Sequence, residues 1–466
     1  MKYAFFTFDG FGLPLAKRLI NEGHDVIVGT VNNIEETLTN SEKKNRRSEP
    51  SKDKIQRLQK YNGIVPKTSA YKLLQKLKKV KNPQEYFIFF DDNNLFTYAN
   101  ELKQYNFYGN FPTMEDKEFE FDREKAKKFV NAHYPDLLVA ENKTFKKISD
   151  AEVFLKSNRN LWVLKSQTNS LVTFVPNTND IEQSNKQILE TLYASHTLYE
   201  KTEFMLEKKI QSIIEITPEK IYYDGVPLGM TINFENKFLN NGNTGIQVGC
   251  AGDLVFPVSM DSKIHDLCFP PIVDKLAKKH KGLFFWDASL LIEKKTGDMY
   301  FGEFCPNRPG FDCFYTYLTQ LPSAHYFFET VVQKKSPFTL GTVGASVMLF
   351  NLSQDTDTHQ IQSDITVSLT NKHMKNIWLY DVYHDKKTSE YKTVGYDNQL
   401  GPVTGTGNTI TQAASAVYET IKNVQMSGLY YRPKFDYLSL DYQTSILNRL
   451  EYVIQKKLFS LPFSIQ

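Results

Sequence analysis

The sequence predicts an α/β and α+β multidomain protein with an open parallel sheet at its N-terminus and a small mixed β/α C-terminal domain. Three observations support this prediction. The chain has 466 residues, which is too many for one hydrophobic core. Residues 1–118 alternate strand-like and helix-like segments, a pattern typical of parallel sheets. Beyond them, strand-like runs follow one another across short turns, as in antiparallel sheets.

Composition and charge restrict the class of protein. Hydrophobic residues make up 41% of the chain and aromatic residues 14%, so stable cores are expected. The net charge of +3 is too small to attract the protein as a whole to nucleic acid or to a membrane. The 4 cysteines lack CxxC spacing, which argues against structural zinc or disulfides and favours a reducing compartment. Since no signal peptide or membrane span is recognisable, we expect a soluble, cytoplasmic protein.

The N-terminal domain begins as strand, turn and helix. The strand "KYAFFTF" (2–8) is followed by a turn containing Asp9, Gly10 and Gly12, and then by the helix "LPLAKRLINEG" and the strand "HDVIVGTV". Backbone amides at such a helix start can face an anionic ligand. A further strand, "EYFIFF", ends in "DDNN" (91–94), and residues 41–60 form a charged segment. A dinucleotide-dependent dehydrogenase is disfavoured because "DGFGLPLA" lacks the G-x-G-x-x-G pattern.

The next predicted strand with a candidate functional residue has a lysine close to its end. After the helix "DREKAKKFVNAHYP", the runs "LWVLKS" and "LVTFVP" predict a hairpin around residues 167–170. Lys165 follows three apolar residues in the first of these strands. It is either a phosphate ligand or a lysine that extends to the sheet edge.

Two acids mark a second hairpin. "WDASLLIE" (286–293) and "MYFGEF" (299–304) are strands joined by a short turn. A register that pairs Asp287 with Glu303 would place their Cβ atoms roughly 5 Å apart. With Asn307 nearby, such carboxylates suit Mg²⁺; the alternative is two solvated acids.

A third feature is the glycine-rich segment "NNGNTGIQVGCAGDLVF" (240–256). Its glycines predict a loop rich in exposed backbone amides, which either cradles an anion or is a plain connector.

The order of these features resembles that of ATP-grasp carboxylate–amine ligases. "NTGIQVGCAG" is similar to the glycine-rich loop of the glycinamide ribonucleotide synthetase (phosphoribosylamine–glycine ligase) family, and "GEFCPNRPG" to its Glu-Phe-Asn-x-Arg-x-Gly stretch. "GASVMLF", "VTGTGNTITQAASAVYETIKNV" and "YYRPKF" resemble the family's C-terminal domain. The resemblance implies an ATP-grasp fold with an N-terminal Rossmann-like domain (1–118), an ATP-grasp domain (119–334, lid about 150–205) and a C-terminal domain (335–466).

The resemblance also implies roles for individual residues. It implies ATP binding by Arg123 (with Lys125 and Lys127 as fallbacks), Lys165, Glu207 and Glu215; metal binding by Asp287, Glu303 and Asn307; catalysis by Arg308 and Lys165; carboxylate binding by the amides around Thr244, Gly245, Gly249 and Gly252; and acceptor binding by Asp9, Gly10 and Gly12. ATP and Mg²⁺ are the implied cofactors, with Mn²⁺ as the alternative metal. The implied reaction converts a carboxylate, with glycine favoured, into an acyl phosphate that an amine attacks.

Departures from the family pattern leave the acceptor open. Asn307 and Arg308 are adjacent, so either a residue is inserted or Cys305 occupies the usual Asn position. The start of the chain lacks the family's Gly-Gly-Arg-Glu-His stretch. The acceptor is therefore phosphoribosylamine in purine biosynthesis, another small amine, or a nucleotide or nucleic acid. An alternative of another class is a catalytically silent ATP-binding protein. The expected oligomeric state is a monomer or a homodimer.

Overall fold

The computed structural model describes residues 1–31, 61–166, 173–293, 295–354, 361–369, 375–396, 398–433 and 446–461. The chain divides into two compact units. Unit 1 comprises Met1–Lys117, Ile216–Asp287 and Cys305–Gln466, and unit 2 comprises Glu118–Glu215 and Ala288–Phe304. The division into domains 1–118, 119–334 and 335–466 stays a prediction, and the charged segment 41–60 lies outside the described residues.

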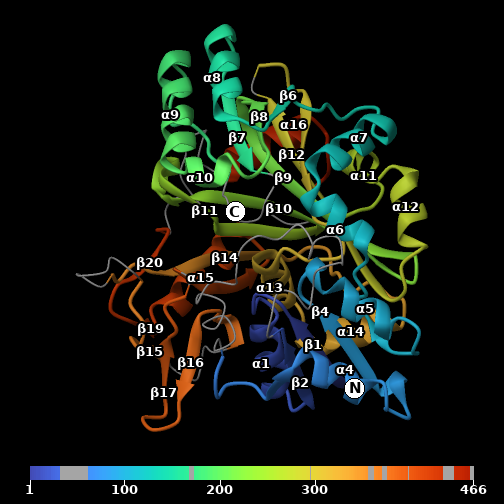
Figure 1. Ribbon diagram of the computed structural model, residues 1–466. Coiled ribbons are helices and arrows are strands. Elements are labelled where there is room, and N and C mark those ends of the chain that lie inside the picture. Colours follow the sequence, from blue (N-terminus) through green and yellow to red (C-terminus); the bar gives the residue numbers. More distant parts are fainter. Residues whose placement is uncertain are drawn as a thin grey trace. The chain divides into compact units, whose positions relative to one another are not determined.

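Unit 1 contains the predicted parallel sheet. Its strands have the order β3-β2-β1-β4-β5, and all neighbours are parallel. Figure 1 labels β1, β2 and β4 of this sheet. They are β1 (Lys2–Thr7), β2 (Val26–Thr30), β3 (Lys67–Ser69), β4 (Tyr86–Phe90) and β5 (Tyr108–Gly109). Helix α1 (Leu13–Asn21) follows β1 and α5 (Phe96–Leu102) follows β4, which confirms the predicted strand–helix alternation.

Helices bury both faces of this sheet. Phe6 and Phe90 form a core with α4 (Ala70–Leu77) and α5 on one face. On the other face the Phe89 ring lies 6.3 Å from Phe314 of α13 (Phe311–Thr319), and the Phe87 ring 4.6 Å from Phe328 of α14 (Ala324–Val332). Burial on both faces explains why β1 and β4 are continuous apolar runs.

The rest of unit 1 is mainly antiparallel. Part of β9 (Ser212–Tyr223) pairs with β10 (Val226–Asn240), followed in order by β11 (Thr244–Val258), β14 (Val343–Asn351) and β18 (Gln399–Gly407). A short helix, η4 (Asn241–Asn243), joins β10 to β11, and α15 (Ile410–Ile421) contacts β14 and β18. The remaining elements are η2 (Pro83–Glu85), η3 (Asn93–Leu95), α11 (Lys263–Cys268), α12 (Pro271–Ala277), β15 (Thr366–Leu369), β16 (Val382–Asp385), β17 (Glu390–Thr393), β19 (Val424–Gln425), β20 (Leu429–Tyr431) and α16 (Ile446–Gln455).

Unit 2 is built on a three-stranded antiparallel sheet. Its order is β6 (Asn142–Phe145), β8 (Phe204–Lys208), β7 (Trp162–Ser166). Helices α8 (Ile148–Ser157) and α9 (Ile181–Ala194) lie side by side against it and bury Trp162 and Leu164 in a common core (Figure 1). Helices α7 (Arg123–His133) and α10 (His196–Tyr199) and strand β13 (Met299–Phe304) complete the unit, and α6 (Met114–Phe121) and β12 (Leu283–Glu293) cross its boundaries.

Three local predictions can be compared with this fold. Leu164 and Phe174 exchange backbone hydrogen bonds of 2.8 and 3.0 Å, as the predicted hairpin requires, while its turn at 167–170 lies outside the described residues. The predicted glycine-rich loop is wrong over most of its length, because residues 244–258 form β11 and pair with β10. The predicted register of the acid hairpin is also wrong: Ala288 pairs with Phe304, and a bulge shifts the ladder before Leu290 pairs with Phe301.

Among the described residues, no helix is both long enough and apolar enough to cross a membrane.

Candidate active site

The most buried group of predicted ATP-binding residues lies in unit 2. Glu207, on the central strand β8, accepts hydrogen bonds from Lys165 of β7 and Lys127 of α7. The Lys165 Nζ lies 2.5 Å from Glu207 Oε1, and Lys127 contacts Glu207 Oε2. The side chains are 12%, 8% and 6% exposed for Lys165, Lys127 and Glu207. One acid therefore holds two ammonium groups together in a mostly dry environment.

Charge pairing decides the protonation of this cluster. Burial alone would raise the pKa of Glu207, but the nearby ammonium groups of Lys165 and Lys127 outweigh it, so the pKa lies below its ordinary value. Burial lowers the pKa of Lys127 in spite of the attraction of Glu207. With one carboxylate facing two ammonium groups, the cluster keeps excess positive charge that an anion such as a phosphate can neutralise.

The other predicted residues of unit 2 form more exposed pairs. Arg123 Nη1 lies 3.7 Å from Glu303 Oε2, and the Glu303 side chain is 56% exposed. Lys125 forms a 2.5 Å ion pair with Glu118. Glu215 accepts a 3.0 Å hydrogen bond from Ser289 Oγ. Of the three basic candidates in α7, only the fallback Lys127 is buried beside another predicted ATP ligand.

Unit 1 carries two of the predicted metal ligands. Asp287 is 8% exposed, and its Oδ1 accepts the Cys305 amide at 2.7 Å. Asn307 is 1% exposed, and its Oδ1 has no hydrogen-bond partner in the described part of the chain. A buried carboxylate and an unsatisfied amide oxygen are hard oxygen donors. These two donors of unit 1 are therefore of the kind that Mg²⁺ prefers.

Asn307 is held in place by several contacts within unit 1. Its backbone is in the left-handed region, with φ of 55°, which asparagine tolerates better than most residues. Its amide donates to Phe285 O at 2.7 Å, and its Nδ2 to Asp116 Oδ2 at 3.3 Å. The same carboxylate lies 2.9 Å from His280 Nε2. His280 is thus part of the support that orients Asn307.

The predicted catalytic arginine lies at the carboxyl edge of the parallel sheet. Arg308 Nη1 is 3.8 Å from Asp92 Oδ2, and its guanidinium carbon is 6.0 Å from the centre of the Phe11 ring. Ligands of open parallel sheets bind at this edge. Asp92 directly follows β4 and Phe11 lies in the turn after β1, so Arg308 is placed where such a ligand would be.

The turn predicted to bind the acceptor already holds a carboxyl group of the chain itself. Asp91 accepts hydrogen bonds from the Thr7 hydroxyl at 2.5 Å, the Phe8 amide at 3.0 Å and the Gly12 amide at 2.9 Å. The Gly10 amide donates to Thr7 Oγ1 at 2.8 Å. A Cβ on Gly12 would lie 3.1 Å from Asp91 Cβ, which explains a glycine there. Of the residues predicted to bind the acceptor, Gly12 therefore donates its amide to Asp91 and Gly10 donates its amide to Thr7.

Asp91 predicts a measurable pH dependence of stability. Burial raises its pKa to about 7 although three hydrogen bonds oppose the shift. Between about pH 4 and pH 7 the unfolded chain releases this proton while the folded chain keeps it, so stability falls as pH rises, by about 4 kcal/mol in total. Asp91→Asn lacks this contribution. Its free energy of unfolding, measured by urea titration, should therefore rise relative to that of the wild type between pH 5 and pH 8. Asp25→Asn, at an exposed position, is the control; a difference that does not change with pH would contradict the prediction.

The residues predicted to bind a carboxylate lie on β11. Thr244, Gly245 and Gly249 are exposed, whereas Gly252 is buried and pairs with Asn236 and Val347. Gly245 and Gly249 have φ of 79° and 81°, at irregular positions of the β10–β11 ladder. Among the described residues of the predicted segment, the exposed ones therefore end at Gly249, and Gly252 is a buried, paired position of the sheet.

A buried acidic cluster adjoins this strand. Ligand atoms of Cys250, Asp253 and Asp312 lie within 4.8 Å of one another, and Cys250 Sγ donates to Asp253 Oδ1 at 3.1 Å. Burial raises the pKa of Asp253, and the carboxylates of Asp312 and Glu235 raise it further. The raised pKa favours the neutral form of Asp253, which lies close to Asp312 at the start of α13. The sequence marks Asp91 as the first residue of "DDNN", but its bonds to Thr7, Phe8 and Gly12 could not be predicted, and no local motif marks the cluster of Cys250, Asp253 and Asp312.

The comparisons with known proteins agree on the fold. No protein-family model matches the sequence, and neither does any curated protein. The chain is similar in structure to phosphoribosylamine–glycine ligase from Thermotoga maritima, with a TM-score of 0.61 and 16% identity over 93% of this chain and 99% of that one.

Two further solved structures are similar at comparable coverage. The biotin carboxylase domain of the 2-oxoglutarate carboxylase from Hydrogenobacter thermophilus, solved with MgADP and bicarbonate, has a TM-score of 0.56 and 11% identity over 98% of this chain and 99% of that one. L-amino acid ligase from Bacillus licheniformis has a TM-score of 0.51 and 11% identity over 91% of this chain and 98% of that one. The predicted fold is confirmed: the chain has the ATP-grasp fold of these proteins, with a parallel-sheet N-terminal part.

Proposed function

We propose that the protein is an ATP- and Mg²⁺-dependent ligase that activates a carboxylate as an acyl phosphate and joins it to an amine. The observation that carries the proposal is the buried cluster of Lys127, Glu207 and Lys165. A purely structural ion pair needs one cation per acid, whereas the single carboxylate of Glu207 has two lysines beside it. In a fold shared with ATP-dependent ligases, the excess positive charge supports phosphate binding by both lysines.

The proposed reaction has two steps with little proton chemistry. A carboxylate oxygen of the substrate attacks the γ-phosphorus of ATP, the bond to the β,γ-bridging oxygen breaks, and ADP leaves. The amine nitrogen then attacks the acyl carbon, phosphate leaves, and the amine proton passes to solvent. Lys127 and Lys165 neutralise the phosphate oxygens and Arg308 the acyl phosphate, while Glu207 and Glu215 orient adenine and ribose.

The metal would be held by Asp287, Glu303 and Asn307. When bound, Mg²⁺, or Mn²⁺ as the alternative, neutralises charge on the transferred phosphoryl group. The unsatisfied Oδ1 of Asn307 supports this choice of oxygen ligands. Cys305 is disfavoured as the substitute for Asn307, because a thiol is a poor ligand for Mg²⁺.

For the substrates, we propose glycine and a phosphoribosylamine-like acceptor, which would place the protein in purine biosynthesis. The similarity to phosphoribosylamine–glycine ligase from Thermotoga maritima supports this choice. One observation favours a second candidate with the same chemistry, namely a small amine without a phosphate. Asp91 occupies the Phe8 and Gly12 amides, so an acceptor phosphate at that turn would have to displace a buried acid.

The test is ADP release from Mg-ATP with each amino acid, with and without phosphoribosylamine generated in the assay. Turnover with glycine that requires phosphoribosylamine would support the first candidate. Turnover that depends on an amino acid and on a phosphate-free amine would support the second. ATP binding without ADP release under any condition would contradict the ligase and favour a catalytically silent ATP-binding protein.

A further inference from the structure

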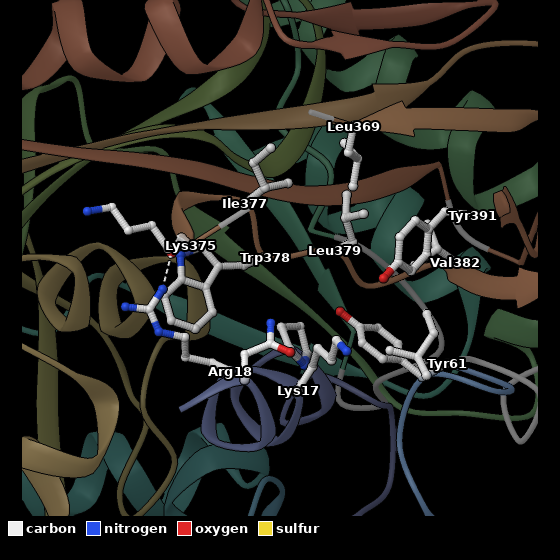
Figure 2. Close-up of a pocket in the computed structure, with 13 residues that line it drawn as sticks. Lys17, Arg18, Tyr61, Leu369, Lys375, Ile377, Trp378, Leu379, Val382 and Tyr391 are labelled. Atoms are coloured by element: carbon white, nitrogen blue, oxygen red, sulfur yellow. Dashed lines mark hydrogen bonds between the residues drawn. The ribbon is translucent and has the colours of Figure 1, made fainter. Parts of the chain in front are cut away.

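A cavity in unit 1 is lined by none of the residues proposed above to bind ATP, metal or substrate. It has a volume of about 40 Å³. One face of α1 forms one wall, through Pro14, Lys17, Arg18 and Asn21, which follow helical spacing. The turn at 61–64 and the segment 375–382 form the others (Figure 2).

Apolar and aromatic side chains make up most of the lining. The residues of this kind are Pro14, Tyr61, Ile64, Leu369, Ile377, Trp378, Leu379, Val382 and Tyr391. In Figure 2 the hydroxyl groups of Tyr61 and Tyr391 point toward the same space. Burial raises the pKa of both tyrosines, so their hydroxyls stay neutral hydrogen-bond donors.

The charged residues of the lining are all cations. Arg18 is already engaged: it contacts Glu22 Oε1 and the Lys375 carbonyl, each at 2.6 Å, and lies 5.8 Å from the Trp378 ring. Lys17 differs, because it forms no ion pair or hydrogen bond with any described residue, although it is partly buried. Burial lowers its pKa. A cation without a counter-ion beside two hydroxyl donors favours an anion.

The backbone of Tyr61 provides independent support. Its φ is 58°, a left-handed conformation that costs a residue other than glycine about 1–2 kcal/mol. The conformation is held by a 2.7 Å hydrogen bond from the Tyr61 amide to Val382 O and by a turn that bonds Ile64 N to Tyr61 O. The side chain is 3% exposed. Strain that places a polar aromatic side chain against a cavity is typical of binding sites.

We propose that this cavity binds the carboxylate of a small aliphatic monocarboxylate. Lys17 pairs with the carboxylate, Tyr61 and Tyr391 donate hydrogen bonds to it, and Ile377 and Leu379 contact the alkyl chain. The cavity has room for about three water molecules, enough for a carboxylate head group with the chain directed toward the opening. None of these residues belongs to the proposed ligase site, so the ligand is an effector or a second bound metabolite.

Calorimetric titration of the full chain with butyrate, at fixed ionic strength, tests the proposal. We expect saturable binding that Lys17→Met weakens at least about tenfold, or about 1.4 kcal/mol. Lys72→Met, at an exposed position of α4, is the matched control and should bind like the wild type. Tyr391→Phe should weaken binding without removing the charge, and it serves as the second variant if Lys17→Met does not fold.

Three outcomes would overturn the proposal. They are no saturable heat with the wild type, equal affinity of the wild type and both site variants, and tighter binding of inorganic phosphate than of butyrate. Titration with Mg-ATP separates this site from the proposed ligase site, because Lys17→Met should bind the nucleotide like the wild type.

Discussion

Lys165→Ala is expected to raise the dissociation constant for ATP at least about tenfold, a loss of about 1.4 kcal/mol. The Lys165 ammonium is held 2.5 Å from Glu207, beside Lys127, in a site from which most water is excluded. A charge-assisted hydrogen bond to phosphate is stronger there than at an exposed position. Nucleotide binding measured by calorimetry in the presence of Mg²⁺ gives the result directly.

The fold should survive this change, because Lys127 still pairs with Glu207. Glu207→Gln provides the contrast: it leaves two buried ammonium groups beside a neutral amide and should destabilise the protein more than Lys165→Ala does. Lys208→Ala, next to Glu207 but exposed, is the matched control and should bind ATP normally. If Lys165→Ala also bound ATP with wild-type affinity, the role assigned to Lys165 would be wrong.

The cluster illustrates what could be predicted from the sequence. Lys165 was identifiable because it ends an apolar strand, and Glu207 because its strand resembles one of a known family. The pairing of Glu207 with Lys127 could not be predicted, because these two residues are 80 positions apart and belong to different elements. Only the fold shows that one acid holds both lysines.

The parallel sheet was predictable for a different reason. Strands β1 and β4 are continuous apolar runs followed by helices, and that local pattern is typical of the topology. The register of the hairpin was not predictable, because a bulge between Ala288 and Leu290 shifts it by one residue without a clear signal in the sequence. The glycine-rich segment was misjudged for a related reason: β10 and β14 pair with it, and these long-range ladders override a loop-like composition.

Glu303→Gln is expected to lower the rate of ADP release at least about 100-fold without lowering the stability of the protein. The Glu303 side chain is 56% exposed, and its described ion pair, with Arg123, is long at 3.7 Å. Exposed pairs of this kind contribute about 0–1 kcal/mol, so the fold does not depend on the charge. The proposed metal site does, because an amide oxygen is a weaker ligand for Mg²⁺ than a carboxylate.

The dependence of the rate on Mg²⁺ distinguishes a lost ligand from a general defect. In Glu303→Gln the concentration of Mg²⁺ that gives half-maximal ADP release should rise, whereas Glu293→Gln, at the other end of the same hairpin, should match the wild type. Near-normal ADP release with an unchanged Mg²⁺ dependence would remove Glu303 from the metal site. That result would leave Asp287 and Asn307 as the proposed ligands, and the ATP-binding role of Lys127 and Lys165 would stand, because the two groups are tested by different measurements.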